Sequence, residues 1–153
     1  MLKKINICEM SLEDLEKIKD ILISDFDDFW NYNILKEELE STNSRYIIAK
    51  TNDGEIIGFA GIKIIIDTAD IMNIVVKKTC RNQGVGNFLL TNLISICKNL
   101  NLSSLSLEVN EDNVSAIHLY EKFGLKRIGL RKNYYHGKNG IVMSYSLWHY
   151  YFI

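Results

Sequence analysis

The sequence contains no proline and only three cysteines among its 153 residues. Cys8, Cys80 and Cys97 are odd in number and lack the short spacings of a metal-binding motif, so we expect neither a disulfide framework nor a metal site. Cys97 lies on an apolar helix face and is predicted to be a buried small hydrophobic residue. No run approaches the roughly 18 apolar residues of a membrane-spanning helix. These absences favour a cytoplasmic protein with no membrane partner.

Strong charge of either sign is also missing. The formal net charge is −1, which gives no reason to expect direct nucleic-acid binding or attachment to a membrane surface. Hydrophobic residues make up 47% of the chain and charged residues 24%, which is typical of a globular protein. The N-terminal residues are too poor in apolar side chains for a signal peptide. Without repeats or a Gly/Ser-rich linker, residues 1–153 are predicted to form a single domain.

The stretch from Ile71 to Leu90 predicts a strand, a glycine turn and a helix in succession. A β-branched run predicts a strand, R-N-Q-G-V-G predicts a turn, and the apolar residues that follow have the spacing of a helix face. A helix that begins at a glycine turn presents unpaired N–H groups and its positive dipole end, which suits a phosphate. Gly84 and Gly86 would let an anion approach the backbone closely, although a plain tight turn explains two glycines equally well.

The N-terminal half predicts one strand, two helices and a hairpin. Ile5 and Ile7 alternate with polar residues, and Ser11 begins a capping box before a helix that continues to Leu22. A second short helix follows through Leu35 and Leu39. Residues 45–50 and 55–66 are predicted to be strands joined by N-D-G, a strong hairpin signal.

In the C-terminal half, residues 104–109 alternate between polar and apolar and predict a strand with one face of each kind. Asn113 is a suitable N-cap for a helix that ends at Gly124. Two last strands, 125–130 and 141–148, flank a loop. The order β-α-α-β-β-β-α-β-α-β-β predicts an α/β (α+β) fold, a mixed central sheet of about seven strands with helices on both faces.

The segment from Asp25 to Asn33 combines three acids with four aromatic residues. Its aromatic side chains could fix a helix to the core while the acids stay in solvent, which is the more common arrangement. The alternative is an acidic rim that receives a cationic substrate.

Two motifs resemble the GNAT superfamily of N-acetyltransferases. R-N-Q-G-V-G, between strand and helix, is similar to the family's acetyl-CoA signature, and L-E-V-N-E-D-N-V-S-A-I-H-L-Y-E-K-F-G-L is similar to its other core motif. N-I-V-V, L-Y-E-K-F-G and R-K-N-Y-Y further resemble the bacterial ribosomal-protein-alanine N-acetyltransferases. The resemblance implies acetyl-CoA as cosubstrate, no metal, and a protein N-terminus as acceptor, in particular that of a ribosomal protein.

The resemblance also implies residue roles. Glu108 matches the general base and Tyr120 the general acid of the family. The residues implied to bind acetyl-CoA are Ile74, Val75, Val76, Arg81, Asn82, Gln83, Gly84, Val85, Gly86, Asn87, Asn113 and Tyr120. Acceptor binding is predicted for Asp27, Asp28, Trp30, Tyr134 and Tyr135, with Asp25 as a further candidate. Two alternatives stay open: a GNAT enzyme for a small amine or lysine, and a non-catalytic domain that binds acetyl-CoA.

Overall fold

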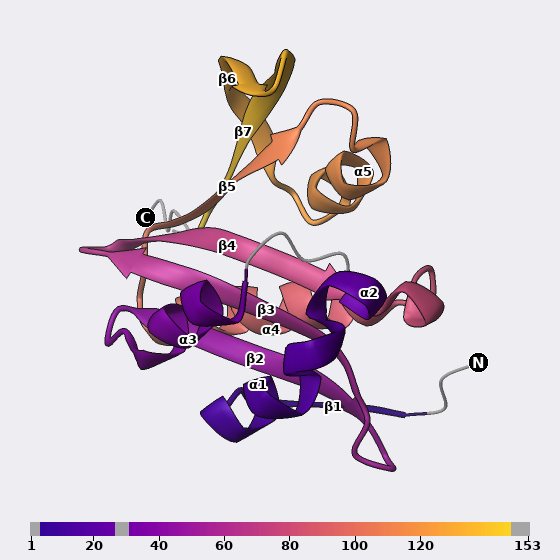
Figure 1. Cartoon of the computed structure of the whole chain (residues 1–153). Helices are drawn as coiled ribbons and strands as arrows, with labels where there is room; N and C mark the ends of the chain where they lie inside the picture. The colour runs from indigo at the N-terminus through magenta and orange to yellow at the C-terminus, as the bar shows by residue number, and fades with distance from the viewer. Residues whose placement is uncertain (1–3, 27–30, 148–153) are drawn as a thin grey trace. The chain divides into compact units, whose positions relative to one another are not determined.

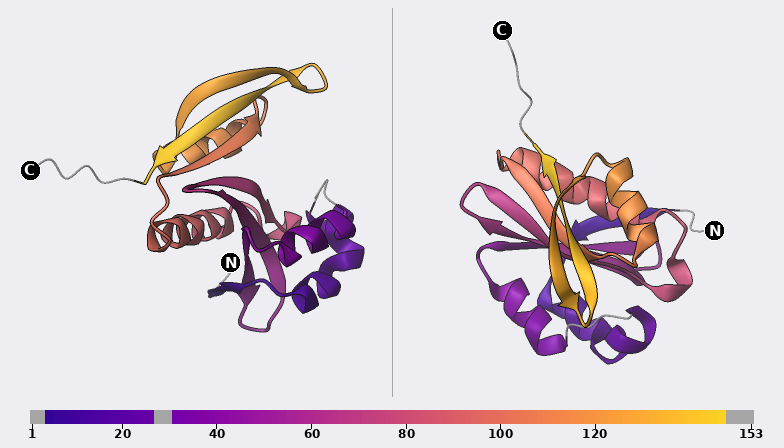
Figure 2. Two further views of the ribbon diagram at one scale, coloured as in Figure 1. Left: turned by 90° about the vertical axis from the view of Figure 1, so that its left-hand side faces the viewer. Right: turned by 90° about the horizontal axis from the view of Figure 1, so that it is seen from above.

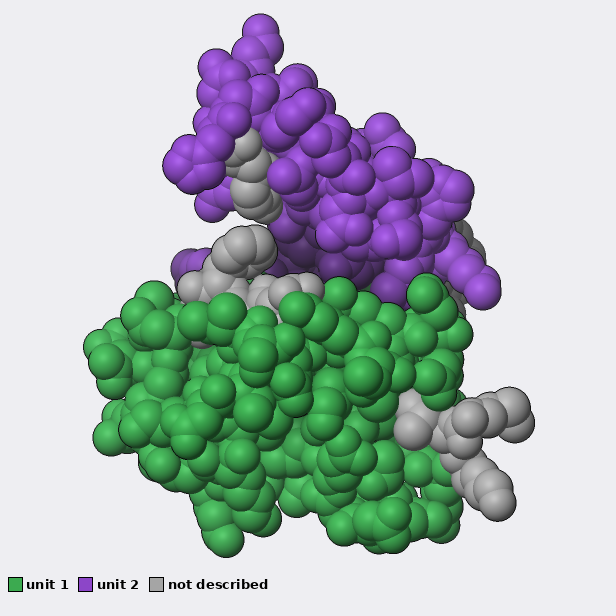
Figure 3. Space-filling model, turned by 45° about the vertical axis from the view of Figure 1, so that its right-hand side comes forward, with its two compact units in different colours: residues 1–64, 72–95 green, residues 65–71, 96–153 purple. Residues whose placement is uncertain are grey.

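The computed structural model describes residues 4–26 and 31–147. Its internal contacts divide the chain into two compact units, coloured green and purple in Figure 3. Unit 1 comprises residues 1–64 and 72–95, and unit 2 comprises residues 65–71 and 96–153. The single domain expected from the sequence stays a prediction.

The elements follow one another in the predicted order (Figure 1). The strands are β1 (Ile5–Glu9), β2 (Ser44–Thr51), β3 (Ile56–Ile65), β4 (Thr68–Val76), β5 (Ser104–Asn110), β6 (Lys126–Tyr135) and β7 (Lys138–Ser146). The helices are α1 (Leu12–Ile18), α2 (Leu22–Phe26), α3 (Tyr32–Glu40), α4 (Val85–Asn99) and α5 (Val114–Lys122), with two 3₁₀ turns, η1 (Lys19–Ile21) and η2 (Lys78–Cys80). Among the described residues, no helix combines the length and the hydrophobicity of a transmembrane span.

The seven strands are hydrogen-bonded in the order β1-β2-β3-β4-β5-β7-β6. The β4–β5 pair is parallel, whereas β1–β2, β2–β3, β5–β7 and β6–β7 are antiparallel. The sheet is therefore mixed, and the predicted α/β class, the strand number and the element order are confirmed.

In unit 1, the strands lie between α1, α2 and α3 on one face and the first part of α4 on the other (Figure 2). Apolar side chains from both helical layers are buried against the strands. On the α1–α3 side the rings of Phe26 and Phe59 lie 5.8 Å apart between centroids. On the α4 side, Gly58 lets the β3 backbone approach Val85 and Leu89, because a Cβ there would lie 3.2 Å from each side chain.

The first predicted helix begins as expected but is interrupted. Ser11 is the N-cap of α1 and forms a reciprocal capping box with Asp14. The expected helix to Leu22 is instead divided into α1, η1 and α2, because Ile18 takes φ −109° and ψ 2° outside the helical region. The break still buries Ile18 and Leu22 in one core cluster.

In unit 2, β5, β7 and β6 pair antiparallel in that spatial order, and α5 connects β5 to β6 in the sequence. The even-numbered residues of β5 from 104 to 110 are partly exposed and the odd-numbered ones buried, as the alternation predicts. Asn113 caps α5 by accepting a hydrogen bond from the Ala116 N–H. Gly124, with φ +97°, follows the helix as expected.

The last hairpin differs from its prediction. The expected loop between residues 130 and 141 is largely strand, because β6 continues to Tyr135 and β7 begins at Lys138. His136 and Gly137 alone join them, with φ of 45° and 90°. Positive φ at both central residues is the geometry of a tight hairpin turn, which needs no longer connection. The predicted end of the last strand at Trp148 lies outside the described residues.

Candidate active site

The predicted cofactor residues of unit 1 follow one continuous path. Ile74, Val75 and Val76 form the end of β4, and the chain then passes through η2 into a turn before α4. Asn82 and Gly84 have φ of 60° and 87°, so the turn uses the left-handed conformation that glycine and asparagine tolerate. A Cβ placed on Gly84 would meet no atom within 4 Å, which leaves open space above the backbone.

This turn presents backbone donors. Within the part of the chain that the structure describes, the N–H groups of residues 82–87 donate no hydrogen bond; the first N–H to do so is that of Phe88, which donates to the Gly84 carbonyl at 3.1 Å. Unpaired N–H groups and the positive end of a 15-residue helix attract an anion. The turn therefore has the geometry that a phosphate or pyrophosphate group requires.

Two asparagine side chains beside this path have buried polar atoms that find no hydrogen-bond partner in the described part of the chain. They are the Oδ1 of Asn87, in the first turn of α4, and both amide atoms of Asn73, which directly precedes Ile74 on β4. Buried polar groups normally find a hydrogen-bond partner, because leaving one unsatisfied costs stability. The unsatisfied atoms thus fit a site whose ligand supplies the missing partners.

Arg81 begins the signature, and its side chain folds back onto the protein. Its Nε donates to the Val76 carbonyl at 3.1 Å, and an Nη donates to the Phe26 carbonyl at 3.3 Å. The first bond holds the turn against the end of β4, and the second ties it to the last residue of α2. Arg81 therefore positions the turn, a role that the resemblance did not imply.

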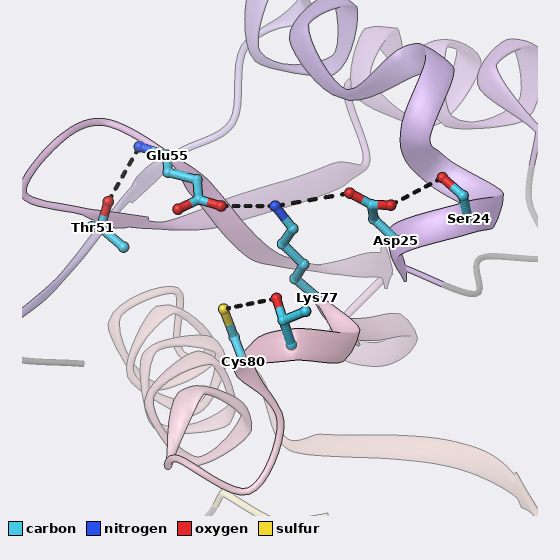
Figure 4. A network of polar contacts seen from close by, with 7 residues as sticks. Ser24, Asp25, Thr51, Glu55, Lys77 and Cys80 are labelled. Atoms are coloured by element: carbon cyan, nitrogen blue, oxygen red, sulfur yellow. Dashed lines mark hydrogen bonds and ion pairs between the residues drawn. The ribbon is translucent and has the colours of Figure 1, made fainter. Parts of the chain in front are cut away.

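Lys77 makes a second connection at the same end of β4 (Figure 4). Its Nζ lies 2.7 Å from Glu55 Oε1 and 3.8 Å from Asp25 Oδ2, while the Ser24 hydroxyl donates to the other oxygen of Asp25. The hydrogen bond with Glu55 raises the pKa of Lys77, and the nearby Asp25 charge acts in the same direction. This network connects β4, α2 and the β2–β3 turn.

Unit 2 carries the predicted base. Glu108 lies on the polar face of β5, and its Oε1 lies 2.8 Å from an Nη of Arg131 on β6. Its Oε2 is buried and has no hydrogen-bond partner among the residues that the structure describes. One oxygen of the carboxylate is thus held by a cation, while the other is available to accept a proton.

The two other predicted residues of this motif are Asn113, the N-cap of α5, and Tyr120, within that helix. The Oδ1 of Asn113 is engaged as the helix cap, so its amide N–H groups remain as donors for a ligand. Tyr120 lies near the end of α5, and its side chain is partly buried.

The structure describes only part of the predicted acceptor group. Asp27, Asp28 and Trp30 lie outside the described residues. Tyr134 is 49% exposed, and its ring lies 4.9 Å from the Arg131 guanidinium carbon; Tyr135 is the last residue of β6. Asp25, a further candidate, contacts Lys77.

The sequence assigned no role to two residues that the structure connects to the site, Lys77 and Arg131. Both are basic residues in stretches already singled out, the end of β4 and R-K-N-Y-Y. Their partners are 22 or more positions away in sequence, so the spacing contained no signal for either pair.

Comparison with known proteins agrees with these motifs. The model of the acetyltransferase (GNAT) family matches residues 15–125. A Bacillus subtilis protein, provisionally named a [ribosomal protein bS18]-alanine N-acetyltransferase, is 36% identical over 94% of this chain and 96% of its own length. A Haemophilus influenzae [ribosomal protein bS18]-alanine N-acetyltransferase is 38% identical over 72% of this chain and 74% of its own length.

Solved structures agree with the fold. The ribosomal-protein-S18-alanine N-acetyltransferase of Escherichia coli superposes with a TM-score of 0.87 at 26% identity and covers 96% of both chains. Ard1 of Thermoplasma volcanium also has 26% identity, with a TM-score of 0.81 over 95% of this chain and 99% of its own. The family model covers well over half of the sequence. The chain therefore belongs to the GNAT acetyltransferase family and is an N-acetyltransferase.

Proposed function

We propose that this enzyme transfers the acetyl group of acetyl-CoA to the N-terminal alanine of ribosomal protein bS18. The observation that carries the proposal is the similarity to the bS18-alanine N-acetyltransferases, which at 36% identity extends over 94% of the chain. Because ribosomal proteins are found in the bacterial cytoplasm, the proposed acceptor implies a cytoplasmic reaction. A spermidine/spermine N-acetyltransferase shares the fold at 16% identity. Similarity at this level concerns the fold alone and is no argument for a small-amine substrate.

Acetyl-CoA would be held by the residues between β4 and α4. The unpaired N–H groups of residues 82–87 suit its pyrophosphate, and the Asn87 Oδ1 can accept a hydrogen bond from an N–H or O–H group elsewhere on acetyl-CoA. Main-chain groups of Ile74, Val75 and Val76 would pair with the pantetheine arm as an added strand does, and an Asn113 amide would donate to the arm. A backbone N–H near Val76 would polarise the thioester oxygen.

Chemistry would then use two side chains of unit 2. The α-amine of a peptide has a pKa of about 7.7 to 8.0, so a modest base can remove its proton. Glu108 would accept this proton on Oε2, directly or through a water, and the neutral nitrogen would attack the thioester carbonyl. Tyr120 would give its phenol proton to the departing thiolate of CoA.

The test uses purified protein, acetyl-CoA and three acceptors: the N-terminal bS18 peptide, the same peptide with a blocked α-amine and a free lysine, and spermidine. Mass spectrometry should show acetylation of the free α-amine. Glu108→Gln should lower kcat by about 10²- to 10⁴-fold, and Tyr120→Phe should also lower it. Glu121→Gln, in an exposed ion pair on α5, is the matched control and should keep full activity. Preferred acetylation of lysine or spermidine would overturn the proposed acceptor, and binding of acetyl-CoA without any transfer would favour the non-catalytic alternative.

A further inference from the structure

The two oxygens of Glu108 have different surroundings. Oε1 lies 2.8 Å from an Arg131 Nη, whereas Oε2 is buried and has no hydrogen-bond partner within residues 4–26 and 31–147. The Glu108 side chain is 23% exposed and that of Arg131 58%. A carboxylate with one oxygen fixed by a guanidinium has a defined orientation, because the planar donor restricts rotation about the last side-chain bond.

The sheet register brings these side chains to one face. Glu108 of β5 pairs with Val142 of β7, and Val142 pairs with Gly129 of β6. Paired residues share a face, and Arg131 is two positions beyond Gly129, so it shares that face as well. Arg131 crosses β7 to reach Glu108, and Gly129 carries no side chain that could lie in its way.

The other side of the guanidinium contacts the predicted acceptor group. The Arg131 Cζ lies 4.9 Å from the ring centroid of Tyr134, within the range of a cation–π contact. Arg131 therefore lies between a ring predicted to bind the acceptor and the carboxylate predicted to remove its proton. All three residues belong to unit 2.

We propose that Arg131 is a positioning residue, which holds Glu108 through Oε1 so that Oε2 alone receives the proton of the acceptor amine. In that step the N–H bond breaks, an O–H bond forms at Oε2, and the electron pair stays on nitrogen. Tyr134 stacks on the guanidinium and orients Arg131 in turn. The inference rests on the proposed function, in which Glu108 is the base.

If the Arg131–Glu108 pair served only the fold, replacing Arg131 would change the stability of the protein and not its kcat. Exposed ion pairs contribute little to stability, and both Arg131 and its neighbour on the same strand, Arg127, are exposed to a similar degree. Arg127 lies 3.1 Å from Glu121, which has no predicted role in catalysis. Arg127→Gln is therefore the matched control for Arg131→Gln.

The experiment measures kcat, the KM for each substrate and the unfolding temperature, using the acceptor that the wild-type chain acetylates best. Arg131→Gln should lower kcat about tenfold or more, with the unfolding temperature and the KM for acetyl-CoA unchanged. Arg131→Lys should recover part of this loss, because an ammonium group can still hold Oε1. Arg127→Gln should behave as wild type.

A double mutant separates this proposal from the assignment of the base. If Arg131 acts through Glu108, adding Arg131→Gln to Glu108→Gln should cause no further loss of kcat. The positioning role would be overturned if Arg131→Gln lowered kcat by the same factor in the Glu108→Gln variant as in the wild type. A wild-type kcat in Arg131→Gln alone would overturn it as well. If Glu108→Gln itself keeps full activity, the assigned base is wrong, and the positioning role fails with it.

Discussion

The Nζ of Lys50 lies 3.1 Å from an oxygen of Asp14, which joins β2 to the first turn of α1. Asp14 also accepts hydrogen bonds from the N–H and the hydroxyl of Ser11, both at 2.9 Å. Burial alone would raise the pKa of Asp14, but these bonds outweigh it, and the pKa is lowered below the ordinary 3.8. The carboxylate is therefore stabilised in its charged form by the folded state.

Replacing Asp14 with asparagine should lower the free energy of unfolding by about 2 kcal/mol, because hydrogen bonds to a buried charged group are lost. Urea unfolding followed by circular dichroism measures this change. Glu13→Gln is the matched control, since Glu13 lies in the same helical turn but is exposed, and it should have little effect. Equal stability losses in the two variants would contradict this prediction.

The contribution of Asp14 should also depend on pH. A carboxyl whose folded-state pKa is lowered stabilises the protein above its unfolded pKa, near 3.8, and loses that contribution as the pH falls through the folded value. The stability difference between wild type and Asp14→Asn should thus be constant near neutral pH and shrink below pH 3.8. Urea titrations over the acid range provide the test, and a difference independent of pH would be the contrary result.

The cysteines should differ sharply in reactivity. Burial raises the pKa of Cys97 to about 11, and its side chain is fully buried, whereas Cys8 is exposed. Since the thiolate is the reactive form, iodoacetamide should modify Cys8 in the native protein and reach Cys97 only after unfolding. Peptide mass spectrometry after native and denatured labelling distinguishes the two sites. Rapid native labelling of Cys97 would contradict its placement in the core.

Capping and turn motifs predicted several of the helix and strand boundaries, because each motif depends on residues that are close together in the sequence. The Ser11 capping box, the N-D-G hairpin and the Asn113 cap each satisfy backbone groups close in sequence, and the structure contains all three. The break at Ile18 was not predicted, because helical spacing continues through it and only packing against the sheet decides the local conformation.

The sequence indicated candidate residues for the site but not the contacts between them. The glycine spacing indicated the turn at Gly84, and the resemblance to the GNAT family implied Glu108 as the base. The contact of Arg131 with Glu108 depends on the register of three strands, and the bonds of Arg81 to Phe26 and Val76 depend on how the turn folds back. Such long-range pairings leave no periodicity in the sequence.

Gly61 should be intolerant of a side chain. A Cβ at this position would lie 2.2 Å from the ring of Tyr46, its partner across the β2–β3 pair. Gly61→Ala must displace this buried ring, so we expect the free energy of unfolding to fall by about 1 to 3 kcal/mol. Gly129→Ala is the control, because its Cβ would meet Val142 at an ordinary 3.7 Å. Similar unfolding temperatures for the two variants would contradict this packing.

Replacing Asn73 with leucine should make the protein more stable and less active. Both polar atoms of the Asn73 side chain are buried and have no hydrogen-bond partner among the described residues. Asn73 directly precedes the strand residues proposed to hold acetyl-CoA. Leucine has nearly the same shape and leaves no unsatisfied group, so Asn73→Leu should raise the free energy of unfolding by about 1 kcal/mol. If a substrate supplies the missing partner, the same variant should have a lower kcat/KM. Asn92→Leu is the control, since its amide already donates to the Phe88 carbonyl at 2.8 Å, and it should gain no stability. A destabilised Asn73→Leu with normal kcat/KM would show that this amide serves the fold rather than the site.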